Sequence, residues 1–498
     1  MALVTSFGAS GDGASDDTDA ILHAIADGDG VLEFPRGTYR ITRTIEIDLA
    51  AHGSLGIVGS HGTARLVMAA AGPALRIVGH HQGTAVPESR TPRTRVAERL
   101  PTVSALEIVG EHAEADGIEL VETMQATFDR LLLTGLRHGV VLRVRNRNFL
   151  LSACHIYDNT GVGVFFDRCD LHQAILSANH ISYNREAGVK ALGGDLHNLQ
   201  ITGNDIEYNY DRRVDAADRL TGSADVWFDA VEGTASEITI ASNTIQSVPS
   251  PGGANLRIAG GTMPALSALP FPGQRHGART VSGRALAAGE PVPSITPTEP
   301  VASAIPLSAR LIAVTGNVLG SQETNIDVSL ADRVTITGNT LYDGLKGTLH
   351  AEECHHLLVS GNTFGWSATE DRGMQGGVLL RNCVGANLTG LVMLDDRAGN
   401  ERAGGAIALV GCRDSAVSNC QILDPRWRGV TLLDCYRVRV SDNSILDRRR
   451  PPQMLAGVEI GGDSVDNLVQ NNLLSRAAGD ALRCPSSGDV VQGNVEVE

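Results

Sequence analysis

Long apolar stretches are missing from this sequence of 498 residues. No run reaches about 18 apolar residues, the length that a membrane-spanning helix needs, so we predict no membrane span. The first residues, MALVTSFGASGDG, also lack the basic region and apolar core of a signal peptide. We therefore expect a cytoplasmic protein if Met1 is the native start, and a secreted one if a leader was removed.

Lysine is almost absent, since only Lys190 and Lys346 occur. The formal net charge is −16, which argues against nucleic acid as a partner, because nucleic acid binding needs a basic surface. Aromatic residues make up only 4% of the chain, whereas glycine occurs 56 times, and this balance favours short strands and tight turns over a helical bundle. The eight cysteines include no CxxC pair, so neither a zinc site nor a thioredoxin-like motif is supported.

The chain does contain a repeat from residue 116 onward. Rows such as AGVKALGGDLHNLQITGNDIEYN (187–209) and TNIDVSLADRVTITGNTLYDGLK (324–346) each read as a strand, a small turn, a second strand, a Gly-Asn corner and a third strand. Neighbouring corners are often 22 to 25 residues apart, a period typical of β-solenoids. The corner asparagines are Asn179, Asn204, Asn243, Asn317, Asn339, Asn362, Asn443, Asn472 and Asn494. Because asparagine tolerates left-handed corners and can hydrogen-bond from rung to rung, we predict an all-β fold, a single-stranded right-handed parallel β-helix.

The cysteines follow the same repeat. Five of them stand at one position after the first strand of their rung, namely Cys169, Cys354, Cys383, Cys412 and Cys435. Adjacent rungs lie roughly 4.8 Å apart, so neighbouring thiols could in principle bridge. Since small buried apolar side chains are the more common use of such a column, we predict that most of these thiols are free.

The entry segment resembles a known superfamily. The stretches FGASGDGASDDTDAILHAI (7–25) and GDGVLEFPRGTYRIT (28–42) are similar to the entry of pectate-lyase-like β-helix proteins, which include polysaccharide lyases and hydrolases and phage tailspikes. Residues 1–50 are thus expected to form an entry and cap segment, with a helix from about Thr18 to Ile25 that Asp16 or Asp17 caps. A cap of this kind closes the open end of a solenoid, and residues 51–498 would form the β-helix itself.

The catalytic signatures of that superfamily are missing. We find no WxDH stretch of pectate lyases, no NTD, GHG or RIK set of polygalacturonases and no DPHE pattern of alginate epimerases. The resemblance therefore implies a fold and a polysaccharide or oligosaccharide substrate, and it assigns no residue. Function has to be argued from the site.

The first strand of each rung, by resemblance, belongs to the sheet that carries the binding groove. Its inward positions are apolar, as in Val226, Leu256 and Ile326. Its outward positions over four rungs, about 15 Å by the rung spacing, carry Trp227, Asp229, Arg257, Asp327, His350 and Glu352. A sugar could stack its C–H face on the tryptophan while its hydroxyls bond to the charged groups. An outward ladder of solvated ion pairs would explain the same charges.

These residues give the predicted site. The catalytic candidates are Asp229, Asp327, Glu352 and His350, and the substrate-binding candidates are Trp227, Arg257, Lys190, Asp225 and Arg381. Glycosidases need two carboxylates, which Asp229, Asp327 and Glu352 could supply, so the leading hypothesis is hydrolysis or transglycosylation with no cofactor and no metal ligand. A lyase is the first alternative. It would use Lys190, Arg257 or His350 as the base, and an arginine or calcium to neutralise a uronate. The second alternative is a tailspike-like protein that binds glycans without turnover.

Four insertions interrupt the repeat, at about 80–101, 210–223, 261–309 and 365–375. The longest is rich in proline, alanine and glycine and is expected to be an irregular loop next to the charged strands. Many proteins of the superfamily are homotrimers, so the resemblance implies a homotrimer with segment 261–309 at its interface.

Overall fold

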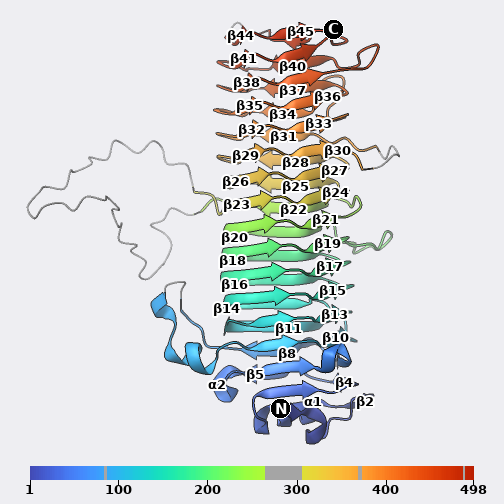
Figure 1. Cartoon of the computed structure of the whole chain (residues 1–498), viewed down its shortest axis with the longest axis vertical. Helices are drawn as coiled ribbons and strands as arrows, with labels where there is room; N and C mark the ends of the chain where they lie inside the picture. Colours follow the sequence, from blue (N-terminus) through green and yellow to red (C-terminus); the bar gives the residue numbers. More distant parts are fainter. Residues whose placement is uncertain (84–86, 264–305, 368–372, 486–487) are drawn as a thin grey trace, which may run out of the picture.

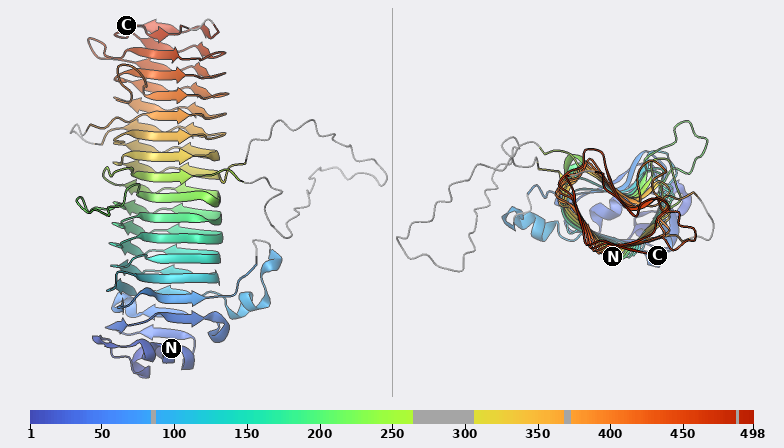
Figure 2. Two further views of the ribbon diagram at one scale, coloured as in Figure 1. Left: turned by 180° about the vertical axis from the view of Figure 1, so that it is seen from behind. Right: turned by 90° about the horizontal axis from the view of Figure 1, so that it is seen from above.

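The structure, a computed structural model, describes residues 1–83, 87–263, 306–367, 373–485 and 488–498. These residues form one stack of rungs that runs from the N-terminus at one end to the C-terminus at the other (Figure 1). Seen from above, the rungs largely superimpose along the stack (Figure 2). Each rung is paired in parallel with the next, so the predicted parallel β-solenoid is confirmed.

Each complete rung contributes three strand positions, which we call first, second and third in chain order. Strands in the first position are β5 (Ile45–Asp48), β8 (Gly72–Val78), β11 (Ala115–Met124), β22 (Ala254–Ala259), β25 (Thr324–Ser329), β28 (Gly347–Glu352), β31 (Val378–Arg381), β34 (Ile407–Val410), β37 (Arg428–Leu433), β40 (Ala456–Gly461) and β43 (Leu482–Arg483). Four long strands span the first and second positions: β14 (Val140–Ser152), β16 (Val162–Ser177), β18 (Ala187–Thr202) and β20 (Ala224–Ala241).

The second and third positions are occupied by shorter strands. The second position holds β1 (Ala2–Leu3), β3 (Val31–Phe34), β6 (Gly56–Gly59), β9 (Thr102–Ser104), β12 (Thr127–Asp129), β23 (Ala309–Thr315), β26 (Ala331–Thr337), β29 (Leu358–Ser360), β32 (Asn387–Thr389), β35 (Ala416–Ser418), β38 (Arg439–Ser441), β41 (Leu468–Gln470) and β44 (Val490–Gln492). The third holds β2 (Asp12–Asp16), β4 (Gly37–Ile41), β7 (Ala64–Met68), β10 (Glu107–Gly110), β13 (Leu132–Thr134), β15 (His155–Tyr157), β17 (His180–Ser182), β19 (Asp205–Glu207), β21 (Thr244–Gln246), β24 (Val318–Gly320), β27 (Thr340–Tyr342), β30 (Thr363–Gly365), β33 (Val392–Leu394), β36 (Gln421–Leu423), β39 (Ser444–Leu446), β42 (Leu473–Ser475) and β45 (Val495–Val497).

Helical segments are short and lie at the N-terminal end or in an insertion. They are η1 (Val4–Phe7), α1 (Thr18–Asp27), α2 (Leu49–His52), η2 (Ser60–Gly62), η3 (Pro87–Ser89) and η4 (Arg93–Ala97). Helix α1 begins at Thr18, as predicted, and buries Ile21 and Ile25 over the end of the stack (Figure 1). The Asp16 carboxylate accepts the Thr18 N–H at 3.1 Å, which satisfies one of the free donors of the first turn. Within the described part of the chain, no helix is long and apolar enough to cross a membrane.

The inward columns form the core. Val189, Val226, Leu256 and Ile326 follow one another in register from β18 to β25, and each is fully buried. Because the rungs stay in register, apolar side chains stack on apolar side chains. The apolar columns are therefore continuous although insertions of different length separate some of the strands in the sequence. Strands before residue 50 already pair within the same two sheets, and the division at residue 50 stays a prediction.

The corner asparagines form the predicted ladder. Asn317, for example, donates both its backbone N–H and its side-chain amide to Oδ1 of Asn339, at 2.9 and 3.0 Å, and its amide also bonds to the Ile240 carbonyl. Each such amide satisfies backbone groups that the corner would otherwise bury without partners. The ladder therefore fixes the register of the stack at every rung that carries it.

None of the eight cysteines forms a disulfide, and seven are buried, which confirms the prediction that most of these thiols are unbridged. Of the predicted insertions, 210–223 separates β19 from β20, and residues 87–101 carry η3 and η4 and project from the stack (Figure 2). Residues 264–305, which make up most of the predicted insertion 261–309, and residues 368–372 of the predicted insertion 365–375 lie outside the described residues.

Candidate functional site

Charged side chains line the outward face of the first-position strands in the register that the sequence predicts. Lys190, Trp227, Arg257, Asp327 and His350 are consecutive partners across β18, β20, β22, β25 and β28. Two residues further along the strands, Asp229, Glu352 and Arg381 also face outward. The rungs thus bring these side chains onto one surface.

Trp227 is enclosed by cations, unlike the open platform that we expected for a sugar. The Lys190 ammonium lies 3.8 Å from the ring centroid, and the Arg257 guanidinium carbon lies 5.3 Å from it. Both are the register neighbours of Trp227, so they meet the ring from the two adjacent rungs. Lys190 also bonds to Glu186 at 2.7 Å and is 8% exposed. The contacts are cation–π interactions that hold the ring in place.

Asp225 does not face the groove, which corrects its prediction as a substrate-binding residue. It is 1% exposed, because the turn that carries Asn209 covers its outer side. Its Oδ1 accepts the backbone and side-chain N–H groups of Asn209, and its Oδ2 accepts the amide of Asn255 at 3.1 Å. Burial raises the pKa of Asp225 to about 7, even though these donors favour the charged form. Asp225 is a structural residue.

Arg257, Asp327 and His350 form a hydrogen-bonded series. Asp327 accepts from Arg257 Nε through Oδ2 and contacts His350 Nδ1 through Oδ1, each at 3.2 Å. Burial acts to raise the pKa of Asp327, but the His350 hydrogen bond and the Arg257 guanidinium outweigh it, so this pKa is lowered. Asp327 therefore stays ionised and orients the His350 ring. The Nε2 atom of His350 is buried and has no hydrogen-bond partner among the described residues.

The three outward carboxylates do not supply an obvious catalytic pair. Asp229 and Glu352 are separated by Ala259 and Ser329 in the register, three rung steps or about 14 Å. Glycosidases need carboxyl groups within about 5 to 9.5 Å of each other. Asp327 lies nearer to both, but each of its oxygens is already bonded.

A cavity of about 640 Å³ adjoins His350 on its C-terminal side. Its floor is made by outward residues of β31, β34 and β37, which include Leu379 and Thr431, and its walls by residues 375–377 and 398–405. His350 of β28 and Glu459 of β40 lie toward its two ends. Of the predicted site residues, His350 and Arg381 line this cavity, whereas its walls follow no pattern in the sequence and were not predicted.

The charged side chains of the cavity lining are mostly cationic. Among the described residues, the lining includes Arg381, Arg402 and Lys346 and one carboxylate, Glu459. Glu459 is neutralised by Arg428 at 2.9 Å and Arg483 at 3.2 Å, and Lys346 is paired with Glu323. Arg381 is exposed, and in the described part of the chain its side chain has no ion-pair or hydrogen-bond partner. The cavity is therefore suited to an anionic ligand.

The sequence analysis did not predict a second polar cluster, although the motif Asp-Leu-His recurs in adjacent rungs, at 170–172 and 195–197. His197 Nε2 lies 2.8 Å from Asp195 Oδ1, and its Nδ1 lies 2.8 Å from Ser236 Oγ. The hydrogen bond to Asp195 raises the pKa of His197. Because Ser236 is only 1% exposed, we assign no catalytic role to this series. Among the described residues, no group of three or more His, Cys, Asp or Glu side chains is arranged to hold a metal ion.

Comparisons with known proteins agree with the architecture. A model described as "Right handed beta helix region" matches residues 102–252 and 314–497, and one described as "Rhamnogalacturonase A/epimerase, pectate lyase-like" matches residues 2–72. The chain belongs to the right-handed β-helix family. No curated protein matches the sequence.

Solved structures also match the chain at low identity. The A-module of the mannuronan C-5 epimerase AlgE6 from Azotobacter vinelandii is 14% identical, with 100% of both chains covered and a TM-score of 0.42. The tailspike protein gp49 from Pseudomonas phage LKA1 is 12% identical, with 99% of this chain and 83% of that chain covered and a TM-score of 0.46.

Proposed function

We propose that the protein binds an acidic polysaccharide in the cavity next to His350 and cleaves it by β-elimination. The observation that carries this proposal is His350 itself, which lines the cavity, which Asp327 orients through Nδ1, and whose Nε2 has no hydrogen-bond partner among the described residues. The similarity of the entry segment to pectate-lyase-like proteins favours a carbohydrate substrate.

The chemistry needs one base and one cation. Neutral His350 would take the proton from the carbon beside the uronate carboxylate, a double bond would form, and the bond to the leaving sugar oxygen would break. That oxygen would then take up a proton. Arg381 would bind the substrate carboxylate and so stabilise the negative charge that develops when the proton leaves. Calcium is the alternative group for this role. Hydrolysis is less well supported, because the outward carboxylates are either too far apart or already bonded.

The test is an activity panel with variants. Polygalacturonate, alginate, inulin and dextran are incubated with the protein and scored for unsaturated uronate absorbance and for reducing ends, with and without EDTA. We expect absorbance on an acidic polymer, a loss of at least 100-fold in His350→Gln, and a large loss in Arg381→Gln. His356→Gln is the matched control, since His356 Nδ1 also bonds an aspartate, Asp332, at 2.8 Å but lies outside the cavity.

Other outcomes would contradict the proposal. Reducing ends from a neutral polymer without absorbance would favour the hydrolase, with Asp327 and Glu352 to be tested next. If EDTA abolishes the activity, a bound metal ion and not Arg381 would neutralise the substrate carboxylate. Binding without any turnover would favour a glycan-binding protein. The homotrimer also stays a proposal, and light scattering of the full chain would test it.

A further inference from the structure

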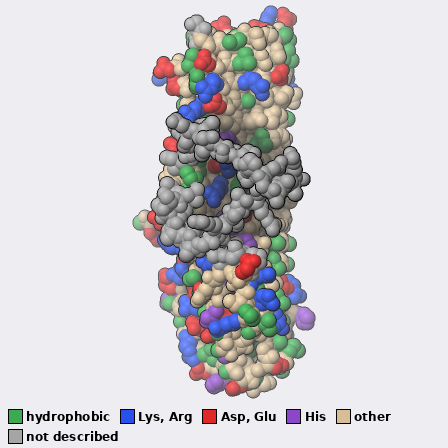
Figure 3. Space-filling view, turned by 90° about the vertical axis from the view of Figure 1, so that its left-hand side faces the viewer, with side chains coloured by type: hydrophobic (Ala, Val, Ile, Leu, Met, Phe, Trp, Pro, Cys, Tyr) green, Lys and Arg blue, Asp and Glu red, His purple; other side chains and the backbone are tan. Residues whose placement is uncertain are grey.

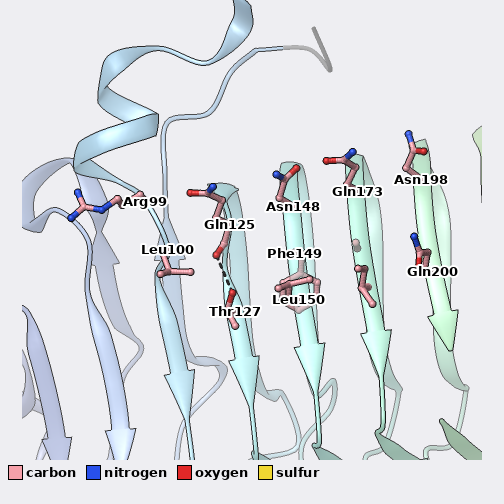
Figure 4. Close-up of a pocket in the computed structure, with 12 residues that line it drawn as sticks. Arg99, Leu100, Gln125, Thr127, Asn148, Phe149, Leu150, Gln173, Asn198 and Gln200 are labelled. Atoms are coloured by element: carbon pink, nitrogen blue, oxygen red, sulfur yellow. Dashed lines mark hydrogen bonds between the residues drawn. The ribbon is translucent and has the colours of Figure 1, made fainter. Parts of the chain in front are cut away.

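A second groove lies away from the His350 cavity, on the second-position strands near the N-terminal half of the stack. It has a volume of about 600 Å³ and is bounded by Arg99 and Leu100, where the projecting segment returns to the stack. Figure 4 shows its amide side chains, which stand side by side on neighbouring rungs: Gln125, Asn148, Gln173 and Asn198.

These four amides share one backbone position. Each lies at the bend between the two halves of its rung and has a positive φ, between 56° and 72°. The same bend in the later rungs holds Glu237, Leu311, Arg333, His356, Gly385, Asp414, Arg437 and Asp466, all with positive φ. The bend thus accepts many side chains, and glutamine has no special preference for this conformation. Four consecutive amides occur only where the described chain forms the groove, which indicates a role for the amide group itself.

The amides are not used by the fold. No hydrogen bond joins any of the four side chains to another described residue, and the Oδ1 atom of Asn148 is buried without a partner. The corner asparagines behave in the opposite way, because each is bonded to its neighbours and to backbone carbonyls. Gln173 is exposed and Gln125, Asn148 and Asn198 are half-buried, so these amide groups are accessible and free to hydrogen-bond to a ligand in the groove.

Apart from Thr127, Gln200 and Arg99, the rest of the lining is apolar. Leu100 and Leu150 are 52% and 41% exposed, and Ile175 lies next to Leu150 in the register. Arg99 at one end is the only charged residue among the described residues of the lining. Amides that can donate and accept, beside aliphatic side chains, match a sugar with its hydroxyls and C–H surfaces. Without a cluster of cations, the groove favours a neutral sugar over a uronate.

We propose that this groove binds a neutral oligosaccharide whose chain runs along the axis of the solenoid. Rungs are about 4.8 Å apart, close to the length of one sugar ring, so successive sugars can each meet one amide. Four amide rungs give a span of about 14 Å between the first and the last, which sets a binding length of three to four sugars. This inference does not rest on the proposed β-elimination, because the two sites share no residue.

The test is isothermal titration of the full chain with linear malto-, cello-, inulo- and chito-oligosaccharides, and with oligogalacturonate for comparison. Affinity for one neutral series should rise with length and level off near four sugars. The double variant Asn148→Gly/Gln173→Gly should bind at least tenfold more weakly. Glycine suits the positive φ at both positions, so the variant should fold, which circular dichroism would verify.

Asp466→Gly is the matched control, since it changes the same bend outside the groove and should bind like the unaltered protein. His350→Gln should also bind normally, which separates this site from the proposed active site. The inference fails if no neutral series binds, if only oligogalacturonate binds, or if the double variant retains full affinity.

Discussion

The side-chain amide of Asn255 donates a hydrogen bond to Asp225 at 3.1 Å, and this bond points toward the N-terminus. The hydrogen bond that reaches Asp225 from its other side, from Asn209, points toward the C-terminus. Toward the N-terminus, Asn159, Asn184 and Asn209 each donate to the next rung, and the last bond ends on Asp225. Toward the C-terminus, Asn325 donates to Asn255, and Asn255 to Asp225. Two rows of donors meet at one residue, and only a carboxylate offers acceptors to both without presenting an N–H of its own.

We expect Asp225→Asn to change the pH dependence of stability. The pKa of Asp225 is raised to about 7 in the native state, so the native protein binds this proton more tightly than the unfolded chain does. Its contribution to the free energy of unfolding is complete below about pH 4 and is lost as the pH rises toward 7, by up to about 1.4 kcal/mol per pH unit. Urea unfolding between pH 4 and 8 should show this decline in the wild type and not in Asp225→Asn. Asn184→Ala, which removes a rung of the ladder that does not titrate, should keep the wild-type slope.

Asp327→Asn should act in the opposite direction. The pKa of Asp327 is lowered, so its stabilising contribution is present above about pH 4 and is lost as the pH falls through the native pKa. At pH 7 the variant should be less stable by about 1 to 3 kcal/mol, because Arg257 and His350 each lose a charged partner. Between pH 5 and 3 the difference should narrow. Asp480→Asn, at a side chain 84% exposed, is the control, and an equal effect there would refute the assignment.

The two lysines permit a direct comparison. Lys190→Met removes the ammonium that lies over Trp227 and leaves Glu186 without its cation, so we expect a loss of about 1 to 2 kcal/mol in unfolding free energy. Lys346→Met removes an ion pair with Glu323 from a side chain that is 66% exposed, and its cost should stay below about 1 kcal/mol. Chemical unfolding at pH 7 measures both. Equal costs would mean that the contact with Trp227 contributes nothing.

The thiols should report on unfolding. Seven cysteines are buried and free, and burial raises the pKa of Cys169 to about 12, so the reactive thiolate is rare there. Ellman's reagent at pH 8 should label Cys484 alone in the native protein and all eight thiols in denaturant. Rapid labelling of more than one thiol in the native state would contradict the packed cysteine column.

Local patterns in the sequence were sufficient for the fold and the register. Asparagine corners recur in nine rungs, five of them as Gly-Asn, and counting residues from each corner aligns Trp227, Arg257 and Asp327 correctly across an insertion of any length. Asp225 was wrongly predicted to bind substrate. The alternation of inward and outward residues shows on which side of a strand a residue lies, but it does not show whether other residues cover that side. The cavity next to His350 could not be predicted, since its walls come from loops without periodicity. The amides of the second groove do recur once per rung, but the sequence alone does not show that this bend borders a groove.

The bend that repeats once per rung has a practical consequence. Its side chains are outside the core, and the described rungs accept leucine, arginine, aspartate or glycine there without a change in the backbone. The residues at this bend could therefore be substituted one rung at a time, so that each functional group and its spacing along the solenoid axis are chosen. The solenoid thus holds successive side chains at a fixed spacing, on which a recognition surface can be built.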